Sequence, residues 1–151
     1  MEKLSLIVLA SDHAGFQLKE YLKNKLINDG YNIKDVGCFS SESVDYPDFI
    51  SKGAQEVSKD GKRKGVFICG SGIGASIVAN KIKKIRAALV YDKKTALMSR
   101  LHNDANVIVF GGRMIKPSKA YKLLKLWLNT EFSGAERHKR RISKILKLER
   151  G

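Results

Sequence analysis

The sequence has few prolines and no long apolar run. Only 2 prolines occur among 151 residues, while 43% of the chain is hydrophobic, which excludes a disordered polymer and a fibrous repeat. No stretch approaches the length of a membrane span, and the apolar run near the N-terminus is too short for a signal peptide. We therefore expect a globular protein of the cytoplasm, with residues 1–151 forming one domain.

Cysteine and acidic residues are also scarce. The two cysteines, Cys38 and Cys69, form no C-x-x-C pair and stand at no metal-ligand spacing to the three histidines, which predicts reduced thiols and no metal site. Against 15 acidic residues there are 29 Lys and Arg, so the formal net charge is +14. This charge favours an anionic partner: nucleic acid, a membrane surface or a small phosphorylated metabolite. A basic but merely solvated surface, including the C-terminal segment at about 134–151, would explain the charge equally well.

Apolar runs of strand length alternate with longer segments of helical spacing. We expect strands at 4–10, 31–37, 66–69, 85–90 and 106–112, and helices at 12–30, 50–57, 73–82, 92–104 and 116–132, before a last basic amphipathic helix. Tyr46-Pro47 and the serines before it indicate a loop. The alternation predicts an α/β fold of three layers, with a mostly parallel sheet and helices on both faces.

Ligands of such folds bind where the parallel strands end, so the residues that follow the strands are the candidates for chemistry. Ser11, Asp12 and His13 follow the first strand, Cys69 ends another, and Arg113 follows the last. Asp12 is equally suited to cap the next helix. Cys69 is equally well explained as a small buried hydrophobic residue.

The segment after Cys69, residues 70–75, allows two interpretations. It matches G-x-G-x-x-G/A between a strand and a helix, with Asp92 near the spacing of a ribose-binding acid, as in dinucleotide sites. Its mid-chain position and the little sequence left for a substrate domain argue against that interpretation. The alternative is that the backbone N–H groups at a helix start bind developing negative charge, and that the same field activates the Cys69 thiol.

Four residues late in the chain are also candidates. His102 and Asn103 end a predicted helix, where a histidine is also favoured by the helix dipole alone. Arg137 and Arg141 lie four residues apart, on one face of the last helix, which suits a phosphate group as well as it suits solvent.

Several motifs together resemble one family, ribose-5-phosphate isomerase of the B type. They occur in the same order along nearly the whole chain: "SDHAGF", "DYPD", "ICGSGIGASIVANKI", "IRAAL", "SRLHNDANVIVFGGR" and "ERHKRR". The wider family includes the galactose-6-phosphate isomerase subunits of the lactose pathway. The resemblance implies an aldose-ketose isomerase of sugar phosphates on a Rossmann-like fold, with no metal or organic cofactor.

The resemblance also implies roles for individual residues. Cys69 resembles the base that moves a proton between C1 and C2, and His102 the acid that opens the furanose ring. Ser11 and Asp12 resemble contacts to the sugar end, and Asn103 resembles a further binder of the enediolate intermediate.

The rest of the implied site holds the charged groups of the substrate. The cradle for the enediolate oxygens corresponds to Gly70, Ser71, Gly72, Ile73 and Gly74, and the phosphate clamp corresponds to His13, Arg113, Arg137 and Arg141. Each site of the family takes residues from two subunits, which implies a homodimer or a tetramer with shared active sites. Neither a membrane nor a nucleic-acid partner is expected.

Two positions depart from the family pattern. Some members use a glutamate later in the glycine loop as the base, but Ala75 stands there, which leaves Cys69 as the only candidate. Glu136 stands where a glycine often precedes the Arg-His pair, which places a carboxylate near the clamp. The galactose-6-phosphate isomerase subunits lose part of the cysteine, histidine and arginine set, whereas this chain retains it.

We therefore expect interconversion of D-ribose 5-phosphate and D-ribulose 5-phosphate through a cis-enediolate, in the non-oxidative pentose phosphate pathway. A preference for a six-carbon sugar phosphate, such as allose 6-phosphate or galactose 6-phosphate, is the first alternative. The second is a basic module that binds nucleotides or nucleic acid through the glycine loop and the basic tail.

Overall fold

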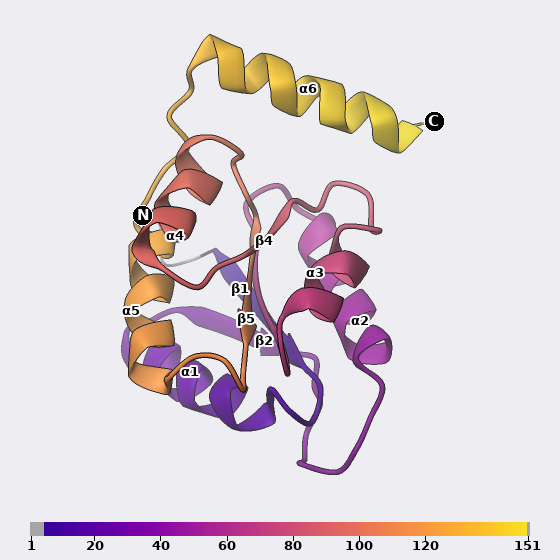
Figure 1. Cartoon of the computed structure of the whole chain (residues 1–151), viewed down its shortest axis with the longest axis vertical. Helices are drawn as coiled ribbons and strands as arrows, with labels where there is room; N and C mark the ends of the chain where they lie inside the picture. The colour runs from indigo at the N-terminus through magenta and orange to yellow at the C-terminus, as the bar shows by residue number, and fades with distance from the viewer. Residues whose placement is uncertain (1–4, 151) are drawn as a thin grey trace.

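The computed structural model describes residues 5–150, which form five strands and six helices in an alternating order (Figure 1). The strands are β1 (Leu6–Ser11), β2 (Asn32–Asp35), β3 (Lys64–Cys69), β4 (Ala87–Leu89) and β5 (Val107–Gly111). The helices are α1 (Phe16–Asn28), α2 (Tyr46–Ser58), α3 (Ile73–Ala79), α4 (Lys93–Leu101), α5 (Pro117–Leu128) and α6 (Glu136–Arg150). Leu4, which we expected in the first strand, lies outside the described residues.

The five strands form one parallel sheet in the order β2-β1-β3-β5-β4. After β1 the chain moves outward to β2, and α2 then carries it back to β3 on the other side of β1. The direction of winding therefore reverses between β1 and β3, the position at which open α/β sheets bind ligands. Ser11 ends one of these two strands and Cys69 ends the other.

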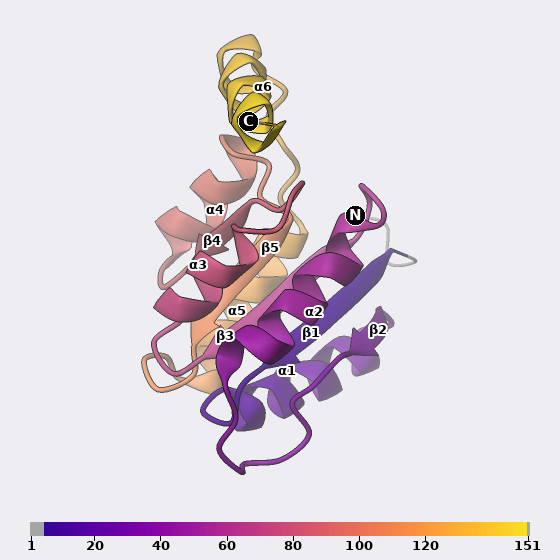
Figure 2. The same ribbon diagram turned by 90° about the vertical axis from the view of Figure 1, so that its right-hand side faces the viewer.

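Helices cover both faces of the sheet, as predicted (Figure 2). On one face α1, α4 and α5 pack over a cluster that includes Leu22, Phe110 and Trp127, all fully buried. On the other face α2 and α3 pack over a second cluster that includes Ile50 and Phe67. The central strands β1, β3 and β5 are almost wholly buried, which explains why their sequences are continuous apolar runs rather than alternating ones.

The helices differ from the sequence expectation at their ends. α1 begins at Phe16 rather than at 12, α4 ends at Leu101 rather than at 104, and α5 ends at Leu128 rather than at 132. α2 begins at Tyr46, within the predicted loop, because Pro47 occupies the first turn, where its fixed φ and missing N–H are tolerated. α3 ends at Ala79 rather than Ile82, since the Asn80 side chain pairs with both the N–H and the carbonyl of Ala87. Each difference shortens or extends an element by about one turn and leaves the topology unchanged.

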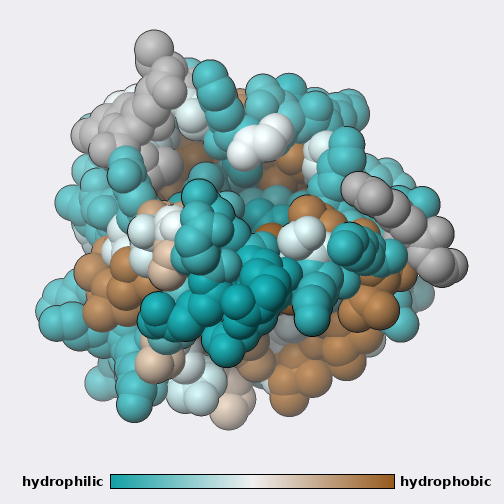
Figure 3. Space-filling view, turned by 90° about the horizontal axis from the view of Figure 1, so that it is seen from above, coloured by the Kyte–Doolittle hydropathy of each residue, from teal (hydrophilic) through white to brown (hydrophobic). Residues whose placement is uncertain are grey.

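The last helix, α6, lies apart from the three layers, beyond the edge at which the strands begin (Figures 1 and 2). It is amphipathic, with Ile142, Ile145 and Leu146 interspersed among basic residues, yet Ile145 and Leu148 stay 40% and 78% exposed. Viewed from the α6 side, the surface is largely hydrophilic and is interrupted by apolar patches (Figure 3). Within residues 5–150 no helix combines the length and the apolar character that crossing a bilayer requires.

Candidate functional site

A cavity of about 500 Å³ opens at the carboxyl edge of the sheet, beside the ends of β1 and β3. Residues of four segments line it: Asp12, Tyr46, Cys69, Gly70, Ser71, Ile73, Gly74, Ile77 and Arg113. Seven of these residues were predicted from the sequence, and the other two, Tyr46 and Ile77, were not.

Cys69 lies at the inner wall of this cavity as the last residue of β3. Its residue surface is 4% exposed, and its carbonyl accepts a hydrogen bond of 2.7 Å from the Gly112 N–H. The Arg113 N–H donates to the Gly70 carbonyl at 3.0 Å. These two bonds tie the turn after β5 to the turn after β3, and the Arg113 side chain lies against Gly70. A thiol and a guanidinium are thereby brought to one cavity.

The glycine loop between Cys69 and α3 needs a glycine at one position in particular. Gly72, the N-cap of α3, has φ +80°, a left-handed conformation that side-chain-bearing residues rarely adopt. A Cβ built there would also lie 2.5 Å from Cδ1 of Leu89. This compact turn lets backbone approach the cavity closely, and a helix start favours negative charge.

The residues after β1 take different positions relative to the cavity. Asp12 lines it, and its Oδ1 accepts a hydrogen bond of 3.0 Å from the Gly15 N–H. Gly15, rather than Asp12, is the N-cap of α1. His13 uses Nδ1 to accept from the Val44 N–H, so it anchors the 40–45 segment beside the site. Ser11, the last residue of β1, is fully buried and does not line the cavity, and its hydroxyl lies 3.8 Å from the Cys38 sulfur.

Tyr46 is the main cavity residue that sequence reasoning missed. Its ring packs on Gly74, where an added Cβ would lie 2.6 Å from Cε1 and Cζ, so the glycine makes room for the ring. The aromatic wall faces the loop that follows Cys69. The "DYPD" motif is a sequence signal for this residue, although its Tyr-Pro pair by itself predicts only a loop.

A second group of predicted residues lies at the opposite edge of the sheet. His102 is the C-cap of α4, and Asn103 follows it in the turn that leads into β5. Cys69 is level with Gly111 at the end of β5, whereas His102 precedes its first residue. Five residues of parallel strand span about 13 Å, so His102 and Cys69 of one chain are separated by more than that.

The start of α6 joins this second group. The His138 ring is stacked on the His102 ring, with centroids 4.4 Å apart and 21° between their planes. Burial lowers the pKa of His138, and the positive charges of Arg137 and Arg141 and the nearby His102 lower it further. Arg137 and Arg141 themselves are exposed to solvent. An imidazole pair flanked by two free guanidinium groups suits an anionic ligand.

A hollow of about 580 Å³ separates the far end of α6 from the body of the molecule. Asn103 lies in its lining together with Arg86 on one side, and Ile145 and Leu148 line it from α6. The apolar stripe of α6 thus faces a space open to solvent within one chain. The predicted site is therefore divided: one half surrounds Cys69, and the other surrounds His102, Asn103 and α6.

Asp92 does not act as the ribose-binding acid that the dinucleotide interpretation requires. It is the N-cap of α4, where its carboxylate accepts a hydrogen bond of 2.8 Å from the Thr95 N–H and the Thr95 hydroxyl lies 3.3 Å from the Asp92 N–H. Hydrogen bonds from the Thr95 backbone and side chain lower the pKa of Asp92. Its carboxylate is therefore engaged in a capping box.

Comparison with known proteins gives one consistent result. A family model described as Ribose/Galactose Isomerase matches residues 7–145. Ribose-5-phosphate isomerase B of Escherichia coli is 38% identical over 143 residues, which cover 95% of each chain. A solved ribose 5-phosphate isomerase of Thermotoga maritima is 43% identical, with a TM-score of 0.91, and the match covers 95% of this chain and 98% of that one. Ribose-5-phosphate isomerase B of Mycoplasma genitalium, solved with bound ribulose-5-phosphate, is 39% identical, with a TM-score of 0.93 and coverage of 97% and 98%.

Proposed function

The chain belongs to the ribose/galactose isomerase family, and on that basis we propose that it interconverts D-ribose 5-phosphate and D-ribulose 5-phosphate in the pentose phosphate pathway of the cytoplasm. The relative with bound ribulose-5-phosphate supports this choice of sugar. The observation that carries the proposal is the cavity in which Cys69 meets the glycine loop and Arg113.

Cys69 acts as the base in this proposal. Its thiolate removes the proton from C2 of the open-chain aldose, which leaves an enediolate with its negative charge on the C1 oxygen. The proton then returns to C1, and a proton passes from the C2 hydroxyl to the C1 oxygen, which gives the ketose. The negative charge develops on oxygen, so donors fixed beforehand at the 70–74 loop stabilise the transition state more than the substrate. The low exposure of Cys69 limits the access of water to its thiol.

The other half of the site comes from a second copy of the chain. His102 protonates the ring oxygen as the furanose opens, and Asn103 binds the enediolate, but both lie at the far edge of the sheet from Cys69 of their own chain. A homodimer in which each carboxyl edge meets the partner's α4–β5 turn and α6 would complete two sites and cover the apolar stripe of α6.

Arginine side chains and His13 hold the phosphate, which does not react. Arg113 comes from the cavity half, and Arg137 and Arg141 come from the α6 half. Guanidinium groups stay charged and bind phosphate oxygens in pairs, so binding energy at this end orients C1 and C2 at Cys69.

The six-carbon alternative follows from the same chemistry with a longer substrate. The cavity of about 500 Å³ is bounded by Tyr46 and Ile77, whose side chains would set the length of sugar accepted. Turnover of allose 6-phosphate against ribose 5-phosphate decides between the two sugars. The nucleic-acid module predicts instead salt-dependent binding to polynucleotide and no isomerase activity.

The first experiment measures ribulose 5-phosphate formation from ribose 5-phosphate with a chelator present, for the wild type and Cys69→Ala. We expect the wild type to be active and Cys69→Ala to lose at least about 100-fold in kcat, as removal of a general base does. A wild type that is inactive on ribose 5-phosphate would overturn the proposal, and six-carbon sugar phosphates would then be assayed as substrates.

Mixing two inactive variants tests the shared site. Cys69→Ala and His102→Ala each damage a different half, so a randomly exchanged dimer population contains one intact site in every mixed dimer. The mixture should recover about a quarter of the wild-type activity, because half of the dimers are mixed and each has one intact site of two. No recovery after demonstrated subunit exchange would place both halves in one chain.

A further inference from the structure

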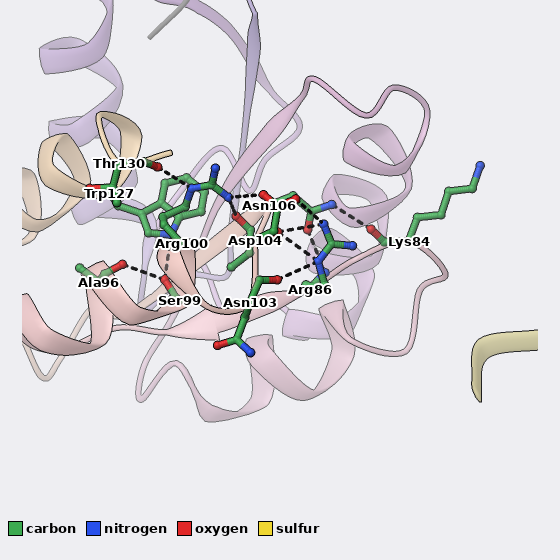
Figure 4. Close-up of polar contacts among 11 residues, drawn as sticks. Lys84, Arg86, Ala96, Ser99, Arg100, Asn103, Asp104, Asn106, Trp127 and Thr130 are labelled. Carbon is green, nitrogen blue, oxygen red and sulfur yellow. Dashed lines mark hydrogen bonds and ion pairs between the residues drawn. The ribbon is translucent and has the colours of Figure 1, made fainter. Parts of the chain in front are cut away.

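The turn that carries His102 and Asn103 is held by two arginine side chains from opposite sides (Figure 4). Arg86, just before β4, donates from Nε to the carbonyl oxygens of Asn103 and Asp104, at 3.1 and 3.0 Å, and from Nη2 to the Asp104 carbonyl at 2.9 Å. A single guanidinium therefore fixes two successive peptide groups directly after His102.

Arg100 holds the same turn from the other side. It donates from Nη1 to the Ala105 carbonyl and to Asp104 Oδ1, both at 2.8 Å, and from Nε to the Thr130 carbonyl at 2.9 Å. Its guanidinium also lies 5.8 Å from the centre of the Trp127 ring. Arg100 is 6% exposed, so these bonds are shielded from water, where they are stronger than at the surface.

Asp104 joins the two arginines. Its Oδ1 accepts from Arg100, and its Oδ2 lies 3.6 Å from Nη2 of Arg86. The backbone of Asp104 has φ +47°, a left-handed conformation that a residue with a side chain seldom adopts without support. The surrounding hydrogen bonds supply that support, so the turn has one conformation rather than several.

We propose that Arg86, together with Arg100 and Asp104, positions His102 for ring opening by fixing the carbonyl groups of the turn that follows it. This inference rests on the proposed function, in which His102 acts in the partner's site. Arg86 touches no substrate atom in this proposal; it acts through the backbone. A catalytic group misplaced by about 1 Å can lose on the order of 100-fold in rate, which makes such support valuable.

The hydrogen bonds of Arg100 also reach the segment that connects α5 to α6. Thr130, which accepts from Arg100, precedes the segment leading to α6, and the Ser133 N–H donates to the Leu101 carbonyl at 3.3 Å. The stack of His138 on His102 then begins within the first turn of α6. Arg100 therefore bonds both the turn after His102 and the segment that leads to α6, whereas the Arg86 side chain bonds the turn alone. A change at Arg86 tests the turn without disturbing that segment.

The experiment is a double-mutant cycle with Arg86→Lys and His102→Asn, assayed with ribose 5-phosphate. Lysine keeps the charge but cannot bridge two carbonyls through one planar group. We expect Arg86→Lys to lower kcat about tenfold with KM changed less than twofold. In the His102→Asn background, where the ring opens only spontaneously, Arg86→Lys should cost clearly less than tenfold. The loss through His102 is then already present and only the loss through Asn103, on the same turn, remains.

Arg63→Lys is the matched control. Arg63 is partly buried and donates to both the backbone carbonyl and the carboxylate of Glu56, but it lies outside both halves of the site. Its kcat should equal that of the wild type. An Arg86→Lys enzyme with unchanged kcat, or one that loses tenfold in both backgrounds, would overturn the positioning role. A wild type inactive on ribose 5-phosphate would instead overturn the proposed function.

Discussion

The imidazole ring of His138 lies almost parallel to that of His102, with 4.4 Å between their centroids. This contact joins the first turn of α6 to the end of α4, two elements that are separated by all of β5 and α5. It draws Arg137 and Arg141 to the same end of the sheet as Asn103. The basic C-terminal segment is thereby part of the candidate site, not only a charged surface.

The His138 contact should make stability depend on pH. Burial and the neighbouring cations lower the pKa of His138 in the folded state, so below the unfolded value of about 6.5 the unfolded chain binds the extra proton. The free energy of unfolding should therefore fall as the pH is lowered from about 6.5. His138→Phe keeps a planar ring that does not titrate. We expect its free energy of unfolding, measured with urea, to fall less between pH 7 and pH 5 than that of the wild type. Parallel pH profiles would contradict this prediction.

Gly72→Ala should destabilise the fold and reduce activity together. The positive φ and the close approach of Leu89 leave no room for a Cβ, and a strained backbone of this kind costs about 1–3 kcal/mol. Urea unfolding of the variant measures the loss. Gly61→Ala is the control, since an added Cβ at Gly61 meets no atom within 4 Å and its φ lies outside the left-handed region. Equal stability of the two variants would show that the loop adapts.

Lys19→Met should be destabilising although it adds an apolar side chain to a buried position. Lys19 is fully buried and lies 2.6 Å from Asp35, whose other oxygen accepts from the Gly37 N–H. Burial by itself would raise the pKa of Asp35, but hydrogen bonds from Lys19, Gly37 and Lys23 outweigh it and the pKa is lowered. Asp35 keeps Lys23, 3.1 Å from the same oxygen, so we expect a cost of about 1–3 kcal/mol, below the about 3–5 kcal/mol of a buried pair that is broken completely.

The comparison for Lys19→Met is Lys59→Met, since Lys59 is exposed and pairs with Glu56 at the surface. Its thermal unfolding should stay close to that of the wild type, because exposed ion pairs contribute about 0–1 kcal/mol. Similar losses of stability in the two variants would mean that the buried ion pair contributes no more than the exposed one. For the Asp35 pair, stability is present above the unfolded pKa of about 3.9 and is lost as the pH falls through the lowered folded value.

Arg141→Ala should raise KM for ribose 5-phosphate more than it lowers kcat. A phosphate contact holds the substrate and the transition state alike, so its loss appears as weaker binding, by about tenfold for one charged hydrogen-bonding group. Steady-state kinetics against Arg140→Ala, an exposed neighbour on the same helix, checks it. An unchanged KM in Arg141→Ala would remove this residue from the clamp.

Local patterns predicted most of the fold because the elements obey local rules. Continuous apolar runs marked β1, β3 and β5, since strands buried on both faces need no polar positions. The start of α2 was missed because Tyr46-Pro47 suits a turn and a first helical turn equally. The end of α3 was missed because it depends on a pairing between Asn80 and Ala87 across the fold.

The candidate site was predicted as a set of residues and not as an arrangement. Cys69 and Arg113 share one cavity because both follow parallel strands, which any α/β pattern predicts. His102 precedes a strand, so the same rule places it at the other edge, although the sequence does not show how the two edges are brought together. The motifs "DYPD" and "ERHKRR" include Tyr46 and His138 but do not show what these residues contact, since Gly74 and His102 lie far from them in the chain.

By itself, the sequence determined the alternation of strands and helices, the order of the motifs and the chemical groups at the strand ends, because these depend on neighbours within a few residues. Only the tertiary structure decided that Cys69 and His102 lie at opposite edges of the sheet, that Tyr46 forms a cavity wall, and that Arg86 and Arg100 hold one turn between them. These relationships join residues that are distant in the chain, and only the packing of the whole sheet and its helices sets their distances.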